Sequence, residues 1–490
     1  MKIAFVYPDI IHGGKSENST GRFNFAIACL SAALKERGHQ TSLAHFLKMP
    51  TRVEFAKEIH RHNPELLAFS YTEEDIDEVM QLLLFAGKDF DHLPNISGGA
   101  YPTLCPQEAI NFEGANMICI GEGEGPLVEL TERMQAGKPY DDIPSLWVRK
   151  ADGVVKNNIM PMEEDLDNLP VMDFELFNFE RLRTGKGHFS RLYFKASRGC
   201  PFNCSYCANH ALKSNYPNKD KFVRFYSPER TIQMLEAILH ANPKLQSVQF
   251  ADDILPLRKE WFREFIEKYR RRIGLPFRCY VHLSLLSEET VRLLRSAGAY
   301  RVSCGIESAN KRVREEIFNR RISNERMMKS LRLLKKGGLQ IHGSCIIGTP
   351  TERPAEIWET LKFFAEAPID IPIASILNPY EGTEIYNYAK DRGMLKDSRH
   401  ILNRGTRLRL EYMSEAQLQF YYSILRLIVL SLRKIKQLPM SVRVPIEAIL
   451  RFIFCKVPLP YRALNWIHDR WFYEFILTRI YRGLERGLFK

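Results

Sequence analysis

Three cysteines carry the clearest chemical signal in this chain: Cys200, Cys204 and Cys207, spaced C-x3-C-x2-C. Thiolates are soft ligands that suit iron–sulfur clusters, zinc and copper(I). Three thiolates on one loop can hold three irons of a [4Fe–4S] cube and leave the fourth iron open. A structural zinc site normally needs four protein ligands, and His210 could supply the fourth. The crowding of all these ligands on one loop favours the open cluster, with a zinc site or inert thiols as the alternatives.

The elements around this loop must position the three thiols. The loop follows the β-like run LYFKASRG, and later apolar runs at 247–253, 277–284, 300–308 and 339–348 predict further strands. Amphipathic stretches between these runs predict helices. Strands that alternate with helices indicate βαβ units and a parallel sheet. We therefore expect residues 191–395 to form a partial or full (βα) barrel with the cysteines on its first strand–helix loop.

Another α/β region lies before this one in the sequence. Residues 1–135 alternate strand-like runs with helical patterns. Parallel sheets bind ligands at the carboxyl ends of their strands, and glycines there let the backbone approach a bulky group. Ordinary tight turns explain one glycine pair, but three such ends on one sheet predict a binding site. The three strand ends are Ser70-Tyr71-Thr72, Ser97-Gly98-Gly99 and Gly121-Glu122-Gly123.

Two further regions complete the chain. Residues 136–190 form a linker or subdomain rich in Pro, Asp and Asn, with a hairpin expected around Asp152 and Gly153. Residues 396–490 are helical, basic and rich in aromatic residues. Large apolar residues beside Lys and Arg are typical of a helix that lies on an anionic membrane surface. A helical cap packed on the catalytic domain, with arginine stems covering apolar surface, is the alternative.

The composition of the 490 residues excludes several classes of protein. Hydrophobic residues make up 45% and charged residues 26%, which are globular values. Ten cysteines are too few for a disulfide scaffold. The formal charge of +12 permits nucleic acid, a membrane surface or an anionic ligand as partner without choosing among them. We expect a cytoplasmic protein, because the sequence shows neither a secretory signal nor a spanning segment, and clustered thiols bind metal in a reducing compartment.

The cysteine motif, with Tyr206 before its last cysteine, resembles that of the radical S-adenosylmethionine (SAM) superfamily. The resemblance implies that Cys200, Cys204 and Cys207 bind a [4Fe–4S] cluster whose open iron chelates the amino and carboxylate groups of SAM. In that superfamily the reduced cluster cleaves SAM to a 5′-deoxyadenosyl radical. The resemblance also implies an electron donor such as flavodoxin or ferredoxin.

Later strand ends resemble the segments that contact SAM in that family. They read F-A-D-D from Phe250, G-I-E-S from Gly305 and I-I-G-T-P-T-E from Ile346, with Thr351 where glycine is usual. Asn378–Thr383 resembles the P-x-x-G-T segment that closes the barrel. His282-Leu283-Ser284 departs from the usual Arg-x-Asp, so the arginine contact to SAM is not predicted, and His282 is either part of a substrate pocket or filler. The residues implied to contact SAM are Tyr206, Asp252, Glu307, Ser308, Ile347 and Gly348.

The N-terminal region placed before this core resembles the B12-binding subfamily, and the resemblance covers about residues 1–395. In that subfamily a flavodoxin-like domain holds cobalamin, whose nucleotide tail threads between strand ends. The D-x-H-x-x-G motif of other B12 proteins is absent, since Asp9 and His12 have another spacing, so we expect cobalamin without a histidine ligand. The loop Pro8–Gly21 is expected near the corrin. The residues implied to line the tail are Ser70, Gly98, Gly99, Gly121, Glu122 and Gly123.

These cofactors imply the function. A radical formed by hydrogen abstraction can accept a methyl group from methylcobalamin, so we expect methylation of an unactivated carbon in a small or lipid-like molecule. A radical SAM oxidoreductase or cyclase that uses the B12-binding domain otherwise is the first alternative. A protein that acts on RNA, or binds nucleic acid with a structural metal, is a distant one. The sequence shows no RNA-binding module, so we expect no nucleic-acid partner.

Overall fold

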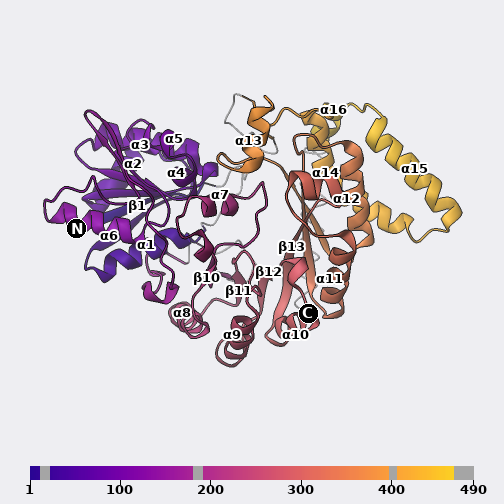
Figure 1. The fold of residues 1–490 in the computed structure, drawn as a ribbon, viewed down its shortest axis with the longest axis horizontal. Helices are drawn as coiled ribbons and strands as arrows, with labels where there is room; N and C mark the ends of the chain where they lie inside the picture. Colours follow the sequence, from indigo (N-terminus) through magenta and orange to yellow (C-terminus); the bar gives the residue numbers. More distant parts are fainter. Residues whose placement is uncertain (11–21, 180–181, 183–190, 397–404, 468–490) are drawn as a thin grey trace. The chain divides into compact units, whose positions relative to one another are not determined.

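The structure is a computed structural model that describes residues 1–10, 22–179, 182, 191–396 and 405–467 (Figure 1). The chain divides into two compact units. Unit 1 contains Met1–Val281, Arg292–Tyr300 and Tyr380–Tyr386, and unit 2 contains His282–Val291, Arg301–Pro379 and Asn387–Lys490. The N-terminal strand ends and the cysteine loop therefore belong to unit 1.

A seven-stranded sheet forms the N-terminal part of unit 1, in the order β2-β1-β3-β4-β5-β6-β7. Its parallel strands are β1 (Lys2–Pro8), β2 (Gln40–Phe46), β3 (Leu66–Ser70), β4 (Asn95–Gly98) and β5 (Met117–Cys119). The order 2-1-3-4-5 is that of flavodoxin-like doubly wound sheets, so the predicted flavodoxin-like domain is confirmed. The hairpin predicted around Asp152 and Gly153 consists of β6 (Leu146–Lys150) and β7 (Gly153–Lys156), and it extends this sheet antiparallel to β5.

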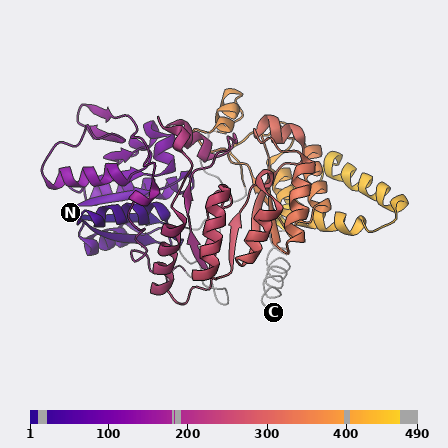
Figure 2. The ribbon, with the colours of Figure 1, turned by 60° about the horizontal axis from the view of Figure 1, so that its bottom comes forward.

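Helices cover both faces of this sheet (Figures 1 and 2). On one face α1 (Phe25–Glu36) packs with α6 (Glu124–Gln135), and on the other α2 (Arg52–His62) packs with α3 (Ile76–Asp89). The short helices α4 (Ala100–Leu104) and α5 (Pro106–Ile110) follow β4. Because both faces are covered, β3 is a continuous apolar run, LLAFS, and all its residues are buried.

Local signals set where these helices begin and end. The side chain of Asn24 accepts a hydrogen bond from the Ile27 N–H at the start of α1. The chain leaves α1 through Gly38, whose φ of +80° is in the left-handed region. Thr51 and Glu54 form a capping box at the start of α2. The helix ends of this domain thus follow from the sequence.

Unit 1 continues into a second α/β region. Here β8 (Arg191–Phe194), β11 (Ser247–Phe250) and β12 (Phe277–Tyr280) are parallel, with β11 in the middle. A short antiparallel pair, β9 (Ser197–Arg198) and β10 (Arg224–Phe225), lies beside the cysteine loop, which α7 (Ala208–Ser214) follows. The helices α8 (Pro228–Ala241) and α9 (Lys259–Arg272) pack against each other. The cysteine loop is therefore the first strand–helix loop of this region, as predicted.

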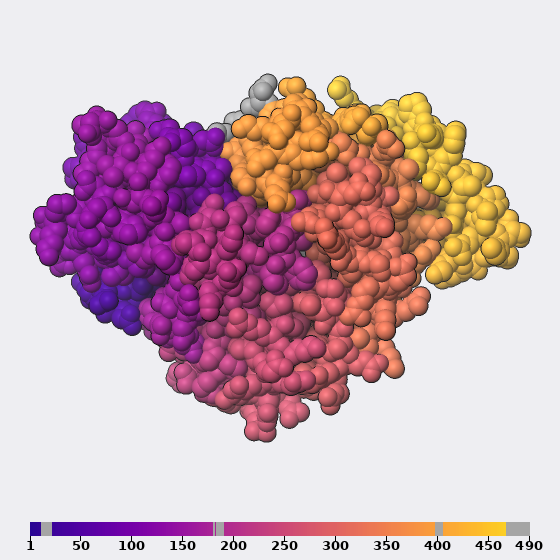
Figure 3. All heavy atoms as spheres, in the orientation of Figure 1, coloured from indigo at the N-terminus to yellow at the C-terminus, as the bar shows by residue number. Residues whose placement is uncertain are grey.

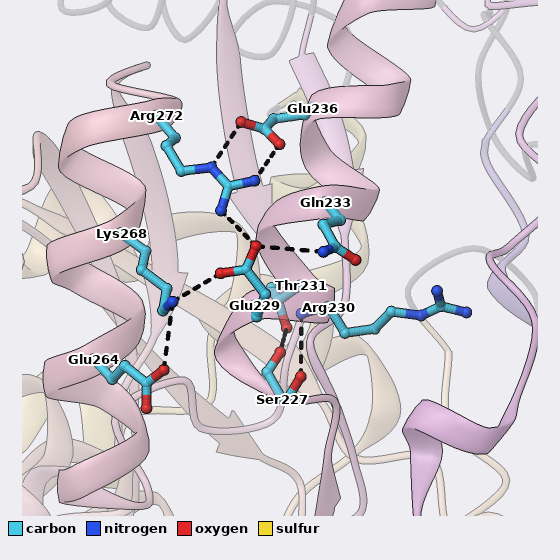
Figure 4. A network of polar contacts seen from close by, with 9 residues as sticks. All are labelled: Ser227, Glu229, Arg230, Thr231, Gln233, Glu236, Glu264, Lys268 and Arg272. Carbon is cyan, nitrogen blue, oxygen red and sulfur yellow. Dashed lines mark hydrogen bonds and ion pairs between the residues drawn. The ribbon is translucent and has the colours of Figure 1, made fainter.

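Charged side chains join α8 to α9 on their solvent side (Figure 4). Glu229 accepts hydrogen bonds from Arg272 at 2.6 Å and from Lys268 at 2.7 Å. Arg272 also donates to Glu236 at 2.8 Å. Ser227 caps α8 by accepting from the Arg230 N–H at 3.1 Å. These solvent-facing pairs connect the two helices, and such pairs add little to stability.

Unit 2 carries the later strands of the βα series. β13 (Ala299–Glu307), β14 (Gln340–Ile347) and β15 (Ile371–Ile376) are parallel, with β14 in the middle. The helices of this series are α10 (Glu288–Ser296), α11 (Asn324–Lys336), α12 (Pro354–Glu366) and α13 (Glu384–Asp391). The predicted parallel series is confirmed. The sequence does not predict β15, because Pro372 interrupts its apolar run, and a proline is tolerated at an edge strand.

Between residues 405 and 467, the described part of the C-terminal region contains three helices: α14 (Glu415–Ile435), α15 (Met440–Lys456) and α16 (Tyr461–Ile467). α14 buries a stripe of residues spaced three or four apart, namely Leu418, Tyr421, Leu425, Val429 and Leu432. The Arg433 guanidinium donates to the carbonyls of Phe364, Ala367 and Ile369 at the end of α12. α14 is therefore packed into unit 2. None of the described helices is long and apolar enough to cross a membrane.

Candidate cofactor sites

A cavity of about 420 Å³ lies at the carboxyl ends of β3, β4 and β5 in unit 1. The structure brings together at this cavity all six residues that the sequence assigns to the cobalamin tail: Ser70, Gly98, Gly99, Gly121, Glu122 and Gly123. Phe25, Cys29 and Leu30 of α1 line it as well. Its largely apolar wall at the strand ends of a doubly wound sheet suits a large cofactor.

The glycines around the cavity have different structural roles. Gly99 has a φ of +105°, and a Cβ there would lie 2.5 Å from the Tyr71 carbonyl oxygen. A Cβ on Gly121, whose φ is +87°, would lie 2.8 Å from Ile159 Cδ1. The fold itself therefore requires glycine at both positions. A Cβ on Gly98 would meet nothing closer than 3.7 Å, so at Gly98 only the space of the cavity favours a missing side chain.

The carboxylate of Glu122 is held by two arginines. It forms a bidentate pair with Arg224 at 2.6 and 2.9 Å, and Arg198 Nη1 lies 3.1 Å away. Arg198 also donates to Glu124 at 2.6 Å. Burial raises the pKa of Glu122, but the two guanidinium groups outweigh it and hold this pKa below its usual value. Glu122 therefore lines the cavity while it ties the loop after β5 to β9 and β10.

The sequence does not assign three further residues of the cavity wall: Lys195, Arg198 and Tyr226. Lys195 directly follows β8, and its ammonium lies 5.9 Å from the centre of the Phe25 ring. Arg198 stands two residues before Cys200, inside the S-R-G-C segment. Their placement beyond strand ends of the second α/β region is the signal that could have marked them. The cavity wall thus contains residues of both α/β regions of unit 1.

Of the loop expected near the corrin, residues 11–21 lie outside the described residues. Asp9, at its start, is fully buried. Its carboxylate accepts hydrogen bonds from His45 Nε2 at 3.0 Å and from Arg22 Nε at 2.9 Å. Asp9 therefore joins the ends of β1 and β2.

The cysteine loop places its three thiols close enough to influence each other's charge. Cys204 is buried, and Cys200 and Cys207 are half-buried. Burial, Asp253 and the neighbouring thiols raise the pKa of Cys200 to about 11. A cysteine binds a metal ion as a thiolate, so its proton is released on binding. A thiol with a raised pKa therefore needs a strong Lewis acid as its partner. Gly199, with a φ of +85°, leads into the loop, and a Cβ there would collide with the Phe222 carbonyl oxygen. This donor set fits an iron–sulfur cluster.

One ring nitrogen of His210 is paired with a carboxylate. Its Nε2 lies 2.9 Å from Glu384 Oε1, and its backbone N–H donates to the Cys207 carbonyl. Nδ1 is buried without a hydrogen-bond partner among the described residues, so this nitrogen stays available to a ligand.

Asp252 provides a buried carboxylate beyond β11. Its Oδ1 accepts hydrogen bonds from the Ala196 N–H at 2.9 Å and from the Ser197 hydroxyl. Its Oδ2 is buried without a hydrogen-bond partner among the described residues. Burial raises the pKa of Asp252 to about 6. An unsatisfied buried acceptor is costly, so this oxygen fits a positively charged donor such as the amino group of SAM. Tyr206, also in unit 1, is half-buried in the cysteine loop.

The other residues expected at SAM lie at two neighbouring strand ends of unit 2. Glu307 ends β13 with a φ of +61°, in the left-handed region, and Ser308 follows it, fully buried. Ile347 ends β14, and Gly348 follows with a φ of +82°. The Ser308 hydroxyl accepts from the Asn310 N–H at 3.2 Å, so it caps the turn. These four residues come together in unit 2, as predicted for the strand ends.

The turn after β14 is built around a carboxyl group. Glu352 is buried and accepts hydrogen bonds from the N–H groups of Gly348 at 2.7 Å and Thr349 at 3.2 Å. Burial raises its pKa to about 8. The Thr349 hydroxyl is buried without a partner among the described residues. This turn therefore holds the Gly348 backbone in place and leaves one polar group for a ligand.

His282 has a local structural role. Its Nδ1 accepts a hydrogen bond from the Ser284 N–H at 3.3 Å and thereby caps the short helical turn Leu283–Leu285. Burial lowers the pKa of His282 to about 3, so the ring is neutral. The capping role is an account of this histidine that the sequence does not give.

Comparisons with known proteins agree with this geometry. A family model described as the radical SAM superfamily matches residues 194–364, and one described as the B12 binding domain matches residues 23–131. The chain is 25% identical over 398 residues to the uncharacterized methyltransferase PH0819 of Pyrococcus horikoshii. The aligned residues cover 81% of this chain and 84% of that protein. It is 22% identical over 409 residues to the anaerobic magnesium-protoporphyrin IX monomethyl ester cyclase of Cereibacter sphaeroides, covering 80% and 64% of the two chains.

A solved structure has the same fold. The cobalamin-dependent SAM radical enzyme OxsB, with aqua-cobalamin and SAM bound, superposes with a TM-score of 0.70 at 15% identity, covering 96% of this chain and 75% of that one. The two family models identify the flavodoxin-like domain as B12-binding and the βα series with three cysteines as a radical SAM domain, so the chain is a radical SAM enzyme with an N-terminal B12-binding domain. The chain thus contains a radical SAM domain and a B12-binding domain, and these domains imply a [4Fe–4S] cluster, SAM and cobalamin as cofactors.

Proposed function

We propose that this enzyme methylates an unactivated carbon of a small or lipid-like molecule. When bound, its cofactors supply a carbon-centred radical and a methyl group. The observation that carries the proposal is that one compact unit holds both the cysteine loop and a cavity lined by all six residues expected at the cobalamin tail. Its similarity to a methyltransferase over 81% of the chain supports the same reaction.

Each group of residues has a proposed role. Cys200, Cys204 and Cys207 bind the cluster as thiolates. Asp252 accepts a hydrogen bond from the amino group of SAM through the oxygen that has no other partner. Gly348, held by Glu352, and the end of β13 bind the rest of SAM. The residues proposed at the cobalamin tail are Ser70, Gly98, Gly99, Gly121, Glu122 and Gly123.

Methyl transfer is tested by the mass of the product. The anaerobically reconstituted enzyme is incubated with SAM, hydroxocobalamin, a reductant and candidate acceptors, and SAM labelled in its methyl group is used in parallel. The proposal expects a product heavier by one methyl, with the label in it. An unlabelled product that is oxidised or isomerised would reject methylation.

Oxidative cyclisation is the second candidate function. The match to the magnesium-protoporphyrin ester cyclase over 80% of this chain favours it. The same assay separates the two, because a cyclase consumes SAM without transferring its methyl group to the product.

Two further proposals concern the surroundings of the enzyme. We propose that a flavodoxin or ferredoxin supplies the electrons. We also propose peripheral membrane contact through the C-terminal region, which is basic and rich in apolar residues. The cytoplasmic location stays a prediction.

A further inference from the structure

Helix α15 presents an apolar face to solvent, which is the reverse of an ordinary surface helix. Met440 is 79% exposed, Ile449 58% and Phe452 61%. With about 3.6 residues per turn, Val442, Ile449 and Ile453 follow one line along the helix, and Phe452 lies beside it. Figure 3 shows the atoms of α15, at the yellow end of the scale, at the surface. The α15 face consists of Val442, Ile449, Phe452 and Ile453, and Met440 and Val444 are exposed at its side.

The opposite side of α15 is anchored, so the helix cannot simply rotate to hide its apolar face. Phe454 is buried, and its ring stacks on Tyr421 of α14 with centroids 3.9 Å apart and contacts Trp358 of α12 at 5.4 Å. Glu447 pairs with Arg443 at 2.6 Å and lies 3.7 Å from Lys362. These contacts within unit 2 fix which side faces solvent.

Basic residues flank the α15 face along the sequence, and acidic residues are few in the same segment. Between Ala416 and Trp466 the sequence has eight basic residues and a single acidic one, Glu447, which already pairs on the anchored side. Lys434 and Lys436 precede the helix and Lys456 ends it, and all three are exposed. Among the described residues, none forms an ion pair with these three lysines. The surface therefore joins exposed apolar side chains to positive charge that no acidic residue of the described part of the chain pairs with.

We propose that the α15 face inserts into the headgroup region of an anionic lipid bilayer, with α15 parallel to the membrane plane. A group of exposed apolar side chains on a helix whose orientation is fixed marks an interaction site. An apolar face rimmed by lysines is the pattern of interfacial helices, and the anionic lipid supplies the charge that the lysines lack. Among the described helices, α15 included, none is long and apolar enough to cross a membrane. The inference deepens the peripheral membrane contact proposed above by naming its surface and its lipid class.

Vesicle co-sedimentation of the full-length, cluster-reconstituted protein tests the α15 face. Vesicles of phosphatidylcholine alone are compared with vesicles that also contain phosphatidylglycerol. We expect binding to the anionic vesicles that weakens at high salt. The double variant Ile449→Ser/Phe452→Ser should lose about tenfold or more in vesicle affinity, and Lys434→Gln/Lys436→Gln should lose affinity for the anionic vesicles only.

A matched control removes exposed apolar side chains elsewhere. Val53 on α2 and Met80 on α3 are 78% and 39% exposed, and Val53→Ser/Met80→Ser should bind vesicles like the wild type. Wild-type protein that ignores both vesicle types would overturn the proposal, as would equal binding by Ile449→Ser/Phe452→Ser. If the protein binds vesicles only after residues 468–490 are deleted, the partner of the α15 face is that segment and not a bilayer. If the wild type is a dimer that does not bind vesicles, and the Ile449→Ser/Phe452→Ser variant is a monomer, the α15 face is the contact with a second copy of the chain.

SAM cleavage measured without lipid separates this inference from the proposed function. Ile449→Ser/Phe452→Ser should cleave SAM at the wild-type rate, because neither residue lies at a cofactor site. Loss of vesicle binding with normal SAM cleavage therefore bears on the membrane surface alone. Normal vesicle binding without methyl transfer bears on the proposed function alone.

Discussion

Glu122, on the loop after β5, and Arg224, in β10, form a bidentate ion pair with oxygen–nitrogen distances of 2.6 and 2.9 Å. Arg198 of β9 joins the same carboxylate, and Arg198 is followed by the cysteine loop. One ion-pair network thus connects the wall of the proposed cobalamin cavity to the strand pair beside the cluster ligands. The two proposed cofactor sites of unit 1 share this connection.

Replacing Arg224 by methionine should destabilise unit 1. Arg224 is 4% exposed, and its loss leaves Glu122 with only Arg198 as partner. We expect a loss of about 2–3 kcal/mol in unfolding free energy, measured by urea unfolding. The matched control is Arg272→Met in the exposed α8–α9 network, which should have a much smaller effect. Equal effects of the two substitutions would contradict the buried network.

Replacing Cys200, Cys204 or Cys207 singly by alanine should remove the cluster and with it SAM cleavage. The assay is iron content and visible absorbance after anaerobic reconstitution, followed by quantification of 5′-deoxyadenosine. Cys455→Ala, at a half-buried thiol of α15, is the control and should keep both. Full iron and SAM cleavage in all three variants would show that these thiols are not the ligands.

Gly98→Val should abolish cobalamin binding while the cluster and the fold survive. A Cβ at Gly98 has room within the protein, so a larger side chain there fills the cavity instead. Gly99→Val is not an equivalent test, since its side chain would collide with the Tyr71 backbone and should destabilise the fold itself. Cobalamin binding is followed by absorbance after gel filtration, and folding by circular dichroism. A folded Gly98→Val protein with full cobalamin would place the cofactor elsewhere.

Asp252→Asn should weaken SAM binding by about 10- to 100-fold, the cost of losing one hydrogen bond between charged groups. The asparagine can still accept from Ala196 and Ser197, so iron content should stay normal. Asp89→Asn, which breaks only a surface pair with Arg52, is the control. Isothermal titration of the reconstituted protein with SAM measures the effect. Unchanged affinity would remove Asp252 from the SAM site.

The raised pKa of the buried Glu352 carboxyl group should make the stability of the protein depend on pH. Its pKa rises from 4.5 to about 8 on folding, so the folded chain holds a proton that the unfolded chain has lost. This stabilisation is complete below pH 4.5 and declines as the pH rises toward about 8. The unfolding free energy of the wild type relative to Glu352→Gln should therefore fall across this window. A difference that rises with pH, or stays flat, would contradict a protonated Glu352.

The sequence predicts the framework well where chemistry and periodicity agree. The cysteine spacing and the glycines at the ends of β4 and β5 are local patterns, and the N-terminal sheet brings the loops after β4 and β5 together. The partners that the folded chain supplies could not be predicted. Arg224 lies 102 residues from Glu122, and nothing local marks the pair. Likewise, the cap that His282 forms and the difference between Gly98 and Gly99 depend on backbone geometry that composition does not contain.

The metal content of the purified protein tests the central claim most directly. The protein is prepared without oxygen, its cluster is reconstituted, and iron and cobalt are counted with and without added hydroxocobalamin. We expect about four irons and about one cobalt per chain. Four irons with no cobalt, even with cobalamin in excess, would contradict the account and leave a radical SAM enzyme that does not use B12.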